Sequence, residues 1–147
     1  MIHLERSALL PQMPEQLLAL VQDVGRYPEF VPNCTGASVN HVDADRSHAS
    51  LQFSMAGLTE SFLTENIVHG DADTSFVLDM RLLRGPFKSL SGRWLIRPLG
   101  REGCKVSLTV TVDLGAWSLG RLLVPQMERT MSSVMQAFQQ RALALHG

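Results

Sequence analysis

The sequence predicts an α+β fold in which an antiparallel β-sheet packs against one long C-terminal helix. Between residues 37 and 114, apolar and polar residues alternate in consecutive stretches, and short turns separate these stretches. After Leu119 the spacing of apolar residues changes to three or four positions, which is typical of a helix. Short turns favour antiparallel pairing of neighbouring strands. A sheet with one apolar face must be covered, and we expect the long helix to cover it.

The first part of the chain predicts a strand, a helix and a stiff turn. Ile2–Leu9 alternates loosely and is typical of a strand. Pro14–Asp23 is typical of a helix, because proline suits the first turn and an apolar stripe follows it. Two prolines then lie within Tyr27–Pro32. Since proline fixes φ and has no backbone N–H, neither a long helix nor a central strand can continue here, and we expect a short turn rather than a regular element.

The middle of the chain predicts further strands, each bounded by glycine, proline or short polar runs. The clearest pattern lies near residue 110, where every second residue is apolar. The predicted strands are Ala37–Val42, Ala49–Met55, Thr59–Val68, Ser75–Leu83, Phe87–Arg97 and Cys104–Leu114. The final helix is predicted from Leu119 onward, and Pro125 either bends it or marks its true start.

Length and composition predict a single globular domain spanning residues 1–147, because 45% of the residues are hydrophobic and 18% are charged. No apolar run approaches the roughly 20 residues of a membrane span. The N-terminus lacks the pattern of a secretory signal. Cys34 and Cys104 are far apart in sequence, so we expect two reduced, buried thiols in a cytoplasmic protein.

Motifs of common catalytic sites are missing from the sequence. It contains no nucleophile elbow, phosphate-binding Walker loop or dinucleotide fingerprint. Its five histidines are scattered, and none lies at metal-ligand spacing from another ligand. Cys34 is interpreted as a structural thiol rather than a nucleophile. We therefore expect a protein that is not an enzyme, with no catalytic residues, no metal and no cofactor.

A curved sheet that grips one helix leaves a gap between them, and ligands commonly bind in such gaps. Several methionines on the helix would make this surface deformable, which suits a lipid-like ligand. An ordinary packed core is the alternative, and these residues alone favour it. The inward-facing candidates for ligand contact are Phe53, Phe62, Phe76, Leu78, Met80, Leu90, Trp94, Met127, Met131, Val134 and Met135.

Positive charge gathers in one part of the chain. Residues 81–105 contain seven basic residues and one acidic residue, a net charge of +6, whereas the remainder carries −7. The alternation of the strands predicts that four of the basic side chains form one patch on the convex face: Arg81, Arg93, Arg97 and Lys105. Binding of phosphate groups is one interpretation of this patch, and a solvated surface is the other.

Two stretches of the sequence resemble a known family. The segment VQDVGRYPEFVPNC at residues 21–34 closely resembles the "DV..YP.F.P.C" signature of the coenzyme Q-binding, START-like family. The segment GPFKSLSGRW at residues 85–94 resembles the second signature of that family, "GPFK.L.G.W", and residues 135–142 match its C-terminal pattern. The chain departs from the family at Arg84, where relatives often carry an acidic residue.

The resemblance implies a START-like helix-grip fold, with an antiparallel sheet wrapped around the C-terminal helix and an apolar tunnel between them. It also implies two functions. One is non-enzymatic binding of an apolar lipid, ubiquinone, in support of respiration; the other is that of a ribosome association toxin, which binds the large subunit and blocks subunit joining. Phe30 and Val31 are then expected to contact the ligand at one end of the tunnel. We expect a cytoplasmic location with peripheral contact at the inner face of the membrane.

Overall fold

The computed structural model describes residues 1–55, 57–116 and 118–146. Within them, seven antiparallel strands form one sheet in the order β1-β7-β6-β5-β4-β3-β2. The strands are β1 (Ile2–Leu10), β2 (Cys34–His41), β3 (Arg46–Met55), β4 (Leu58–Asp71), β5 (Ser75–Arg84), β6 (Ser89–Pro98) and β7 (Cys104–Asp113). The helices are α1 (Pro14–Gln22), the 3-10 helices η1 (Val24–Glu29) and η2 (Ser118–Leu123), and α2 (Val124–His146). The predicted α+β helix-grip fold is confirmed.

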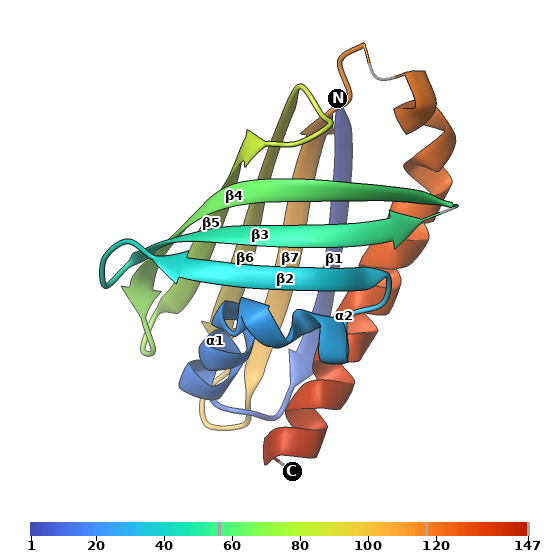
Figure 1. Ribbon diagram of the computed structural model, residues 1–147. Helices are drawn as coiled ribbons and strands as arrows, with labels where there is room; N and C mark the ends of the chain where they lie inside the picture. The colour runs from blue at the N-terminus through green and yellow to red at the C-terminus, as the bar shows by residue number, and fades with distance from the viewer. Residues whose placement is uncertain (56, 117, 147) are drawn as a thin grey trace.

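The sheet bends strongly around α2. Figure 1 shows β2, β3 and β4 crossing in front of β5, β6, β7 and β1 at a steep angle, with α2 running beside them. Strands β2 and β1 form the two edges of the sheet. Because α1 and η1 connect β1 to β2, the chain passes from one edge to the other below β2, in front of the lower ends of the rear strands (Figure 1).

Two arginines attach α2 to the rest of the molecule. Arg6 of β1 donates from Nε to Ser132 Oγ at 2.8 Å and from an NH2 group to the Glu128 carbonyl at 3.2 Å. At the other end of α2, Arg141 donates to Glu29 Oε1 at 3.0 Å, and its guanidinium carbon lies 5.0 Å from the centre of the Phe30 ring. These contacts hold the helix against edge strand β1 and against η1, which supports the grip geometry.

The proline-bracketed stretch differs from its prediction in one respect. Residues 24–29 form a short 3-10 helix that contains Pro28, whereas we expected a turn without regular structure. Pro28 lies inside this helix, where its missing N–H removes one of only a few hydrogen bonds between residues three positions apart. The expectation that no long helix or central strand crosses this stretch is confirmed. At the other end of the chain, Pro125 marks the start of the long helix, since α2 begins at Val124 and η2 precedes it.

Cys34 and Cys104 are buried free thiols, as the sequence predicts. Burial raises the pKa of both. No helix in the described part of the chain is long and apolar enough to cross a membrane. Among the described residues, no three His, Cys, Asp or Glu side chains are grouped so that they could hold a metal ion.

Candidate ligand-binding site

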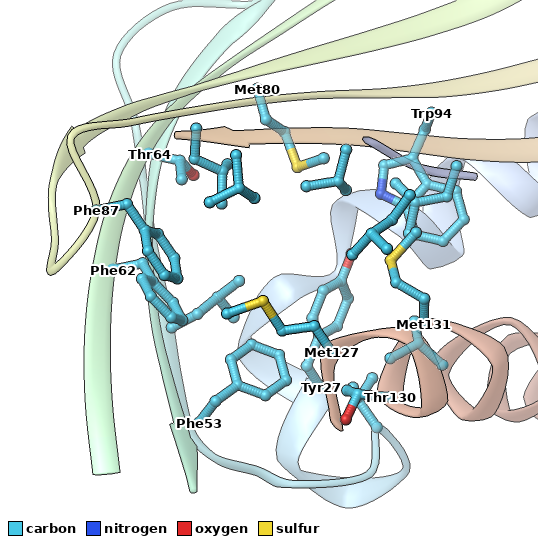
Figure 2. Close-up of a pocket in the computed structure, with 18 of the residues that line it drawn as sticks. Tyr27, Phe53, Phe62, Thr64, Met80, Phe87, Trp94, Met127, Thr130 and Met131 are labelled. Carbon is cyan, nitrogen blue, oxygen red and sulfur yellow. The ribbon is translucent and has the colours of Figure 1, made fainter. Parts of the chain in front are cut away.

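An apolar cavity of about 200 Å³ lies between the concave face of the sheet and α2, and it opens to the surface. Its wall combines side chains from the strands, from α2, and from η1 and the residues that follow it (Figure 2). The lining residues are Leu4, Tyr27, Val31, Leu51, Phe53, Phe62, Thr64, Met80, Phe87, Leu90, Trp94, Leu108, Val110, Val112, Met127, Thr130, Met131, Val134 and Phe138.

Aromatic side chains occupy two opposite ends of the cavity. Figure 2 shows Phe62 and Phe87 on one side and Trp94 on the other. Phe62 and Phe87 stack with ring centres 5.4 Å apart and planes 13° apart, while Trp94 packs against Phe138 with centres 4.8 Å apart. A small recess adjoins the Phe62 end, bounded in part by Glu60 of β4 and Leu123 of η2. The cavity therefore offers flat apolar surfaces at both ends.

Two glycines let large side chains approach one another around the cavity. A Cβ at Gly92 would lie 2.6 Å from Met80 Cε, which is too close for two carbon atoms. The absence of a side chain at Gly92 therefore leaves room for the Met80 side chain in the cavity wall. A Cβ at Gly85 would lie 3.3 Å from Phe62 Cδ1, which would crowd the aromatic end. Both glycines belong to the GPFKSLSGRW segment, so the glycines of this signature shape the cavity wall.

Three hydroxyl groups interrupt the apolar wall, counted over the described lining residues. Tyr27 donates its hydroxyl proton to the Val21 carbonyl. Thr130 Oγ1 accepts a hydrogen bond from Asn33 Nδ2 at 3.3 Å. Thr64 donates to Asn66 Oδ1 at 2.9 Å, and both of these side chains are buried. Each hydroxyl thus has a protein partner, as buried polar groups require.

Burial raises the pKa of Tyr27 far above its ordinary value near 10. Since an unfolded tyrosine ionises near pH 10, the folded state binds more protons above that pH. We therefore expect the free energy of unfolding to fall above about pH 10, by up to about 1.4 kcal/mol per pH unit from this group.

Tyr27 is the only tyrosine in the sequence, so tyrosinate absorbance reports on it alone. The folded protein should show no tyrosinate signal at a pH of about 11, and the signal should appear together with unfolding. The Tyr27→Phe variant is the control, because it removes both the signal and this group's part of the pH dependence. A folded protein that titrates with an ordinary midpoint would contradict the buried hydroxyl.

The cavity wall contains most of the side chains that the sequence suggested for ligand contact. Those in the wall are Val31, Phe53, Phe62, Met80, Leu90, Trp94, Met127, Met131 and Val134. Phe30, Phe76, Leu78 and Met135 do not line it. Leu78 and Met135 are each 4% exposed and belong to the packed core, which Phe76 also contacts. Phe30 packs edge-on against Tyr27 and Phe138, outside the cavity.

Several lining residues were not among the sequence candidates. The most informative of them is Thr64, because its hydroxyl is a polar group in an apolar wall. A period of two places Phe62, Thr64 and Asn66 on the same face of one strand, so alternation alone could have found it. The other residues missed are Leu4, Tyr27, Leu51, Phe87, Leu108, Val110, Val112, Thr130 and Phe138.

The four cations predicted for the convex face fall into two groups that differ in ion pairing. Arg93 donates to Asp79 from Nε at 2.6 Å and from NH2 at 3.1 Å, and Arg81 donates to Glu65 at 3.1 Å. Hydrogen bonding by Arg93 holds the pKa of Asp79 below its usual value. Hydrogen bonds from His48 and then from Arg81 lower the pKa of Glu65. The charges of Arg81 and Arg93 are therefore largely balanced by ion pairs.

Arg97 and Lys105 form the second group, directly opposite each other on β6 and β7. Neither makes an ion pair within the described residues. Of the four cations predicted to share a patch, Arg97 and Lys105 are thus uncompensated, whereas carboxylates on β4 and β5 pair with the other two.

Comparison with known proteins gives matches over the whole chain. The sequence model of a family described as "Polyketide cyclase / dehydrase and lipid transport" matches residues 10–139. The "Ribosome association toxin RatA" of Pseudomonas aeruginosa is 35% identical over 145 residues, covering 99% of this chain and 98% of that protein.

Solved structures share the fold at lower sequence identity. A crystal structure of a Thermus thermophilus protein has a TM-score of 0.84 and 21% identity, covering 99% of this chain and 100% of that one. The Zhui aromatase/cyclase of a Streptomyces species has a TM-score of 0.80 and 16% identity, with coverage of 96% and 93%.

These comparisons correct one expectation from the sequence. We expected a protein that is not an enzyme because the common catalytic motifs are missing. The description of the matching family, however, names a cyclase and a dehydrase, and an aromatase/cyclase shares the fold. The absence of these motifs does not exclude an enzyme, because an active site can be built by side chains from separate strands and needs no contiguous motif. With its family model matched over residues 10–139, the chain belongs to the polyketide cyclase / dehydrase and lipid transport family.

Proposed function

We propose that the protein binds an apolar, ring-bearing ligand in the cavity between its sheet and α2. The observation that carries the proposal is the wall itself, in which aromatic, aliphatic and methionine side chains surround a space of about 200 Å³. Apolar cavities of about 150 Å³ are known to take up a benzene ring. Membership in a family described in part by lipid transport supports the same reading.

The proposal extends to ubiquinone as the ligand and to a supporting role in respiration. A quinone ring suits the flat surfaces of Phe62, Phe87 and Trp94, and the open side of the cavity gives an isoprenoid tail a path outward. The signature-like segments at residues 21–34 and 85–94 also support it. Because a quinone partitions into membranes, contact with the inner face of the membrane stays a prediction of this proposal.

Thermal unfolding in the presence of decylubiquinone tests the proposal. A ligand that binds the folded state at about 100 times its dissociation constant should stabilise the protein by about 2.7 kcal/mol. The matched control is a straight-chain alkane of similar hydrophobicity, which lacks the ring and should stabilise the protein less. An unchanged melting temperature with quinones and with ring hydrocarbons alike would contradict ligand binding.

We further propose association with the large ribosomal subunit as a second function, which would block subunit joining. The specific observation that favours it is the 35% identity, over nearly the whole chain, to a relative named as a ribosome association toxin. Arg97 and Lys105 are the proposed contact residues, since neither is held by an ion pair within the described residues and both lie on the convex face. Uncompensated cations are suited to ribosomal RNA phosphates.

Co-sedimentation with purified large subunits over a range of salt concentrations tests this second function. Binding through phosphate contacts releases counterions, so the logarithm of the affinity should fall linearly with the logarithm of the salt concentration. The small ribosomal subunit is the control particle, because it presents RNA phosphates without the proposed docking site. Equal binding to both subunits, or binding that ignores salt, would contradict the proposal.

A further inference from the structure

Thr64 and Asn66 form a buried polar pair on the concave face of β4. Thr64 is 5% exposed and Asn66 is 4% exposed, and Thr64 Oγ1 donates to Asn66 Oδ1 at 2.9 Å. Thr64 is among the residues that line the cavity (Figure 2). An apolar pair of similar shape would fill these positions at little cost to stability, because exchanging both partners of a buried hydrogen bond is nearly neutral. Folding alone therefore gives no reason for the pair.

The three hydroxyl groups of the cavity wall differ in what they can offer a ligand. The proton of Tyr27 goes to a backbone carbonyl, whose position is fixed by the chain. Thr130 Oγ1 accepts from the Asn33 amide of a different segment. Thr64 is bonded to the amide of Asn66, two residues along the same strand. Asn33 is exposed, whereas the Asn66 amide is buried on the inner face, where it can present either its oxygen acceptor or its N–H donors to Thr64 by turning over.

The orientation of the Asn66 amide decides which ligand atom Thr64 can bind. With the amide oxygen toward Thr64, the threonine donates to it and keeps its own lone pairs, which accept a ligand O–H. With the amide nitrogen toward Thr64, the threonine accepts from it and turns its own proton toward the cavity, where it meets a ligand C=O. The two arrangements have nearly the same shape, because the oxygen and nitrogen of an amide occupy similar volumes.

We propose that Thr64, supported by Asn66, is the polar anchor for one ring oxygen of the ligand and accepts that oxygen as a carbonyl or as a hydroxyl. The ligand class is an apolar ring whose oxygen exchanges between these two forms, as in a quinone and its quinol. This inference rests on the proposed ligand binding and adds a specific contact to it. It makes the cavity indifferent to the redox state of its ligand, so that one site holds both forms.

Three ring compounds of matched shape test the anchor: duroquinone, durohydroquinone under anaerobic conditions, and hexamethylbenzene, in which methyl groups replace the oxygens. Their dissociation constants are measured by equilibrium dialysis. Because a net hydrogen bond contributes about 0.5–1.5 kcal/mol, the quinone and the quinol should each bind about 3- to 10-fold more tightly than hexamethylbenzene. The affinities for quinone and quinol should agree within about threefold.

Thr64→Val is the decisive variant, because it keeps the shape of the side chain and removes the hydroxyl. It should abolish the preference for both oxygenated rings and leave hexamethylbenzene binding unweakened. Thr64→Ser should restore the preference, which a purely structural role of the side chain would not predict. Thr64→Val with Asn66→Leu removes the stranded amide if the single variant is unstable. Thr109→Val, the same change on the convex face of β7, is the matched control.

A preference for oxygenated rings that survives Thr64→Val would overturn the anchor. A difference of more than about tenfold between quinone and quinol would overturn the exchange by amide turnover. Equal binding of all three rings would remove the anchor and leave the apolar cavity intact, whereas failure of all three to bind would remove the proposed ligand-binding function itself.

Discussion

Replacing Val110 by phenylalanine should abolish ligand binding and leave the protein at least as stable as before. Val110 lies in the cavity wall on β7, opposite Gly92 of β6. A larger side chain at this position can therefore extend into the cavity. Filling a cavity commonly adds about 0.5–2 kcal/mol to the free energy of unfolding. The same ring should exclude a ligand ring and weaken binding by at least about 100-fold, because a space of about 200 Å³ does not hold both.

The matched control is Val106→Phe, the same substitution four residues earlier on the same face of β7. Val106 is 2% exposed and does not line the cavity. Overpacking a filled core costs about 1–3 kcal/mol, so this variant should lose stability. Chemical denaturation and equilibrium dialysis give the two quantities for both variants. The cavity would be refuted as the binding site if Val110→Phe were destabilised like Val106→Phe and still bound the ligand.

Reversing the charges of Arg97 and Lys105 together should remove ribosome association. The double change to glutamate replaces two cations by two anions on neighbouring strands, and RNA phosphates then meet repulsion where they met attraction. We expect the affinity for large subunits to fall by about 100-fold or more near physiological salt, and the dependence on salt to become shallower. Co-sedimentation measures both effects, while ligand binding in the cavity should be unaltered.

A charge-matched control is available on the same face. Arg93→Gln with Asp79→Asn removes one cation and one anion that already neutralise each other, so the net charge is unchanged. Ribosome binding by this variant should stay close to that of the original protein, since exposed ion pairs contribute little. Loss of binding in the control, with retention in the reversed variant, would place the contact at Arg93 and contradict the assignment to Arg97 and Lys105.

The sheet and its covering helix could be predicted from sequence because both depend on local patterns. Alternation near residue 110 defines a strand whatever surrounds it, and the change of period after Leu119 defines a helix. The start of α2 at Val124 also follows from local chemistry, since Pro125 fits only the first turn. The 3-10 helix at residues 24–29 was missed because one short turn of helix leaves no periodic signal in the sequence.

The cavity was only partly predictable, because alternation gives the face of a strand but not the depth at which a side chain lies. Leu78 and Met80 share a face of β5, yet Leu78 belongs to the packed core and Met80 lines the cavity. The pairing of Arg93 with Asp79 depends on the register between β5 and β6. The sequence of a single strand does not determine that register. Thr64 was overlooked because a polar residue in a mixed strand is usually exposed to solvent.

The most direct test of ligand binding is native mass spectrometry of the protein purified without detergent from a bacterium that makes ubiquinone. We expect one apolar, ring-bearing molecule per chain, released on unfolding and absent from the Val110→Phe variant purified in parallel. A chain recovered empty, or one whose bound molecule persists in Val110→Phe, would contradict the claim that the cavity between sheet and helix is the binding site.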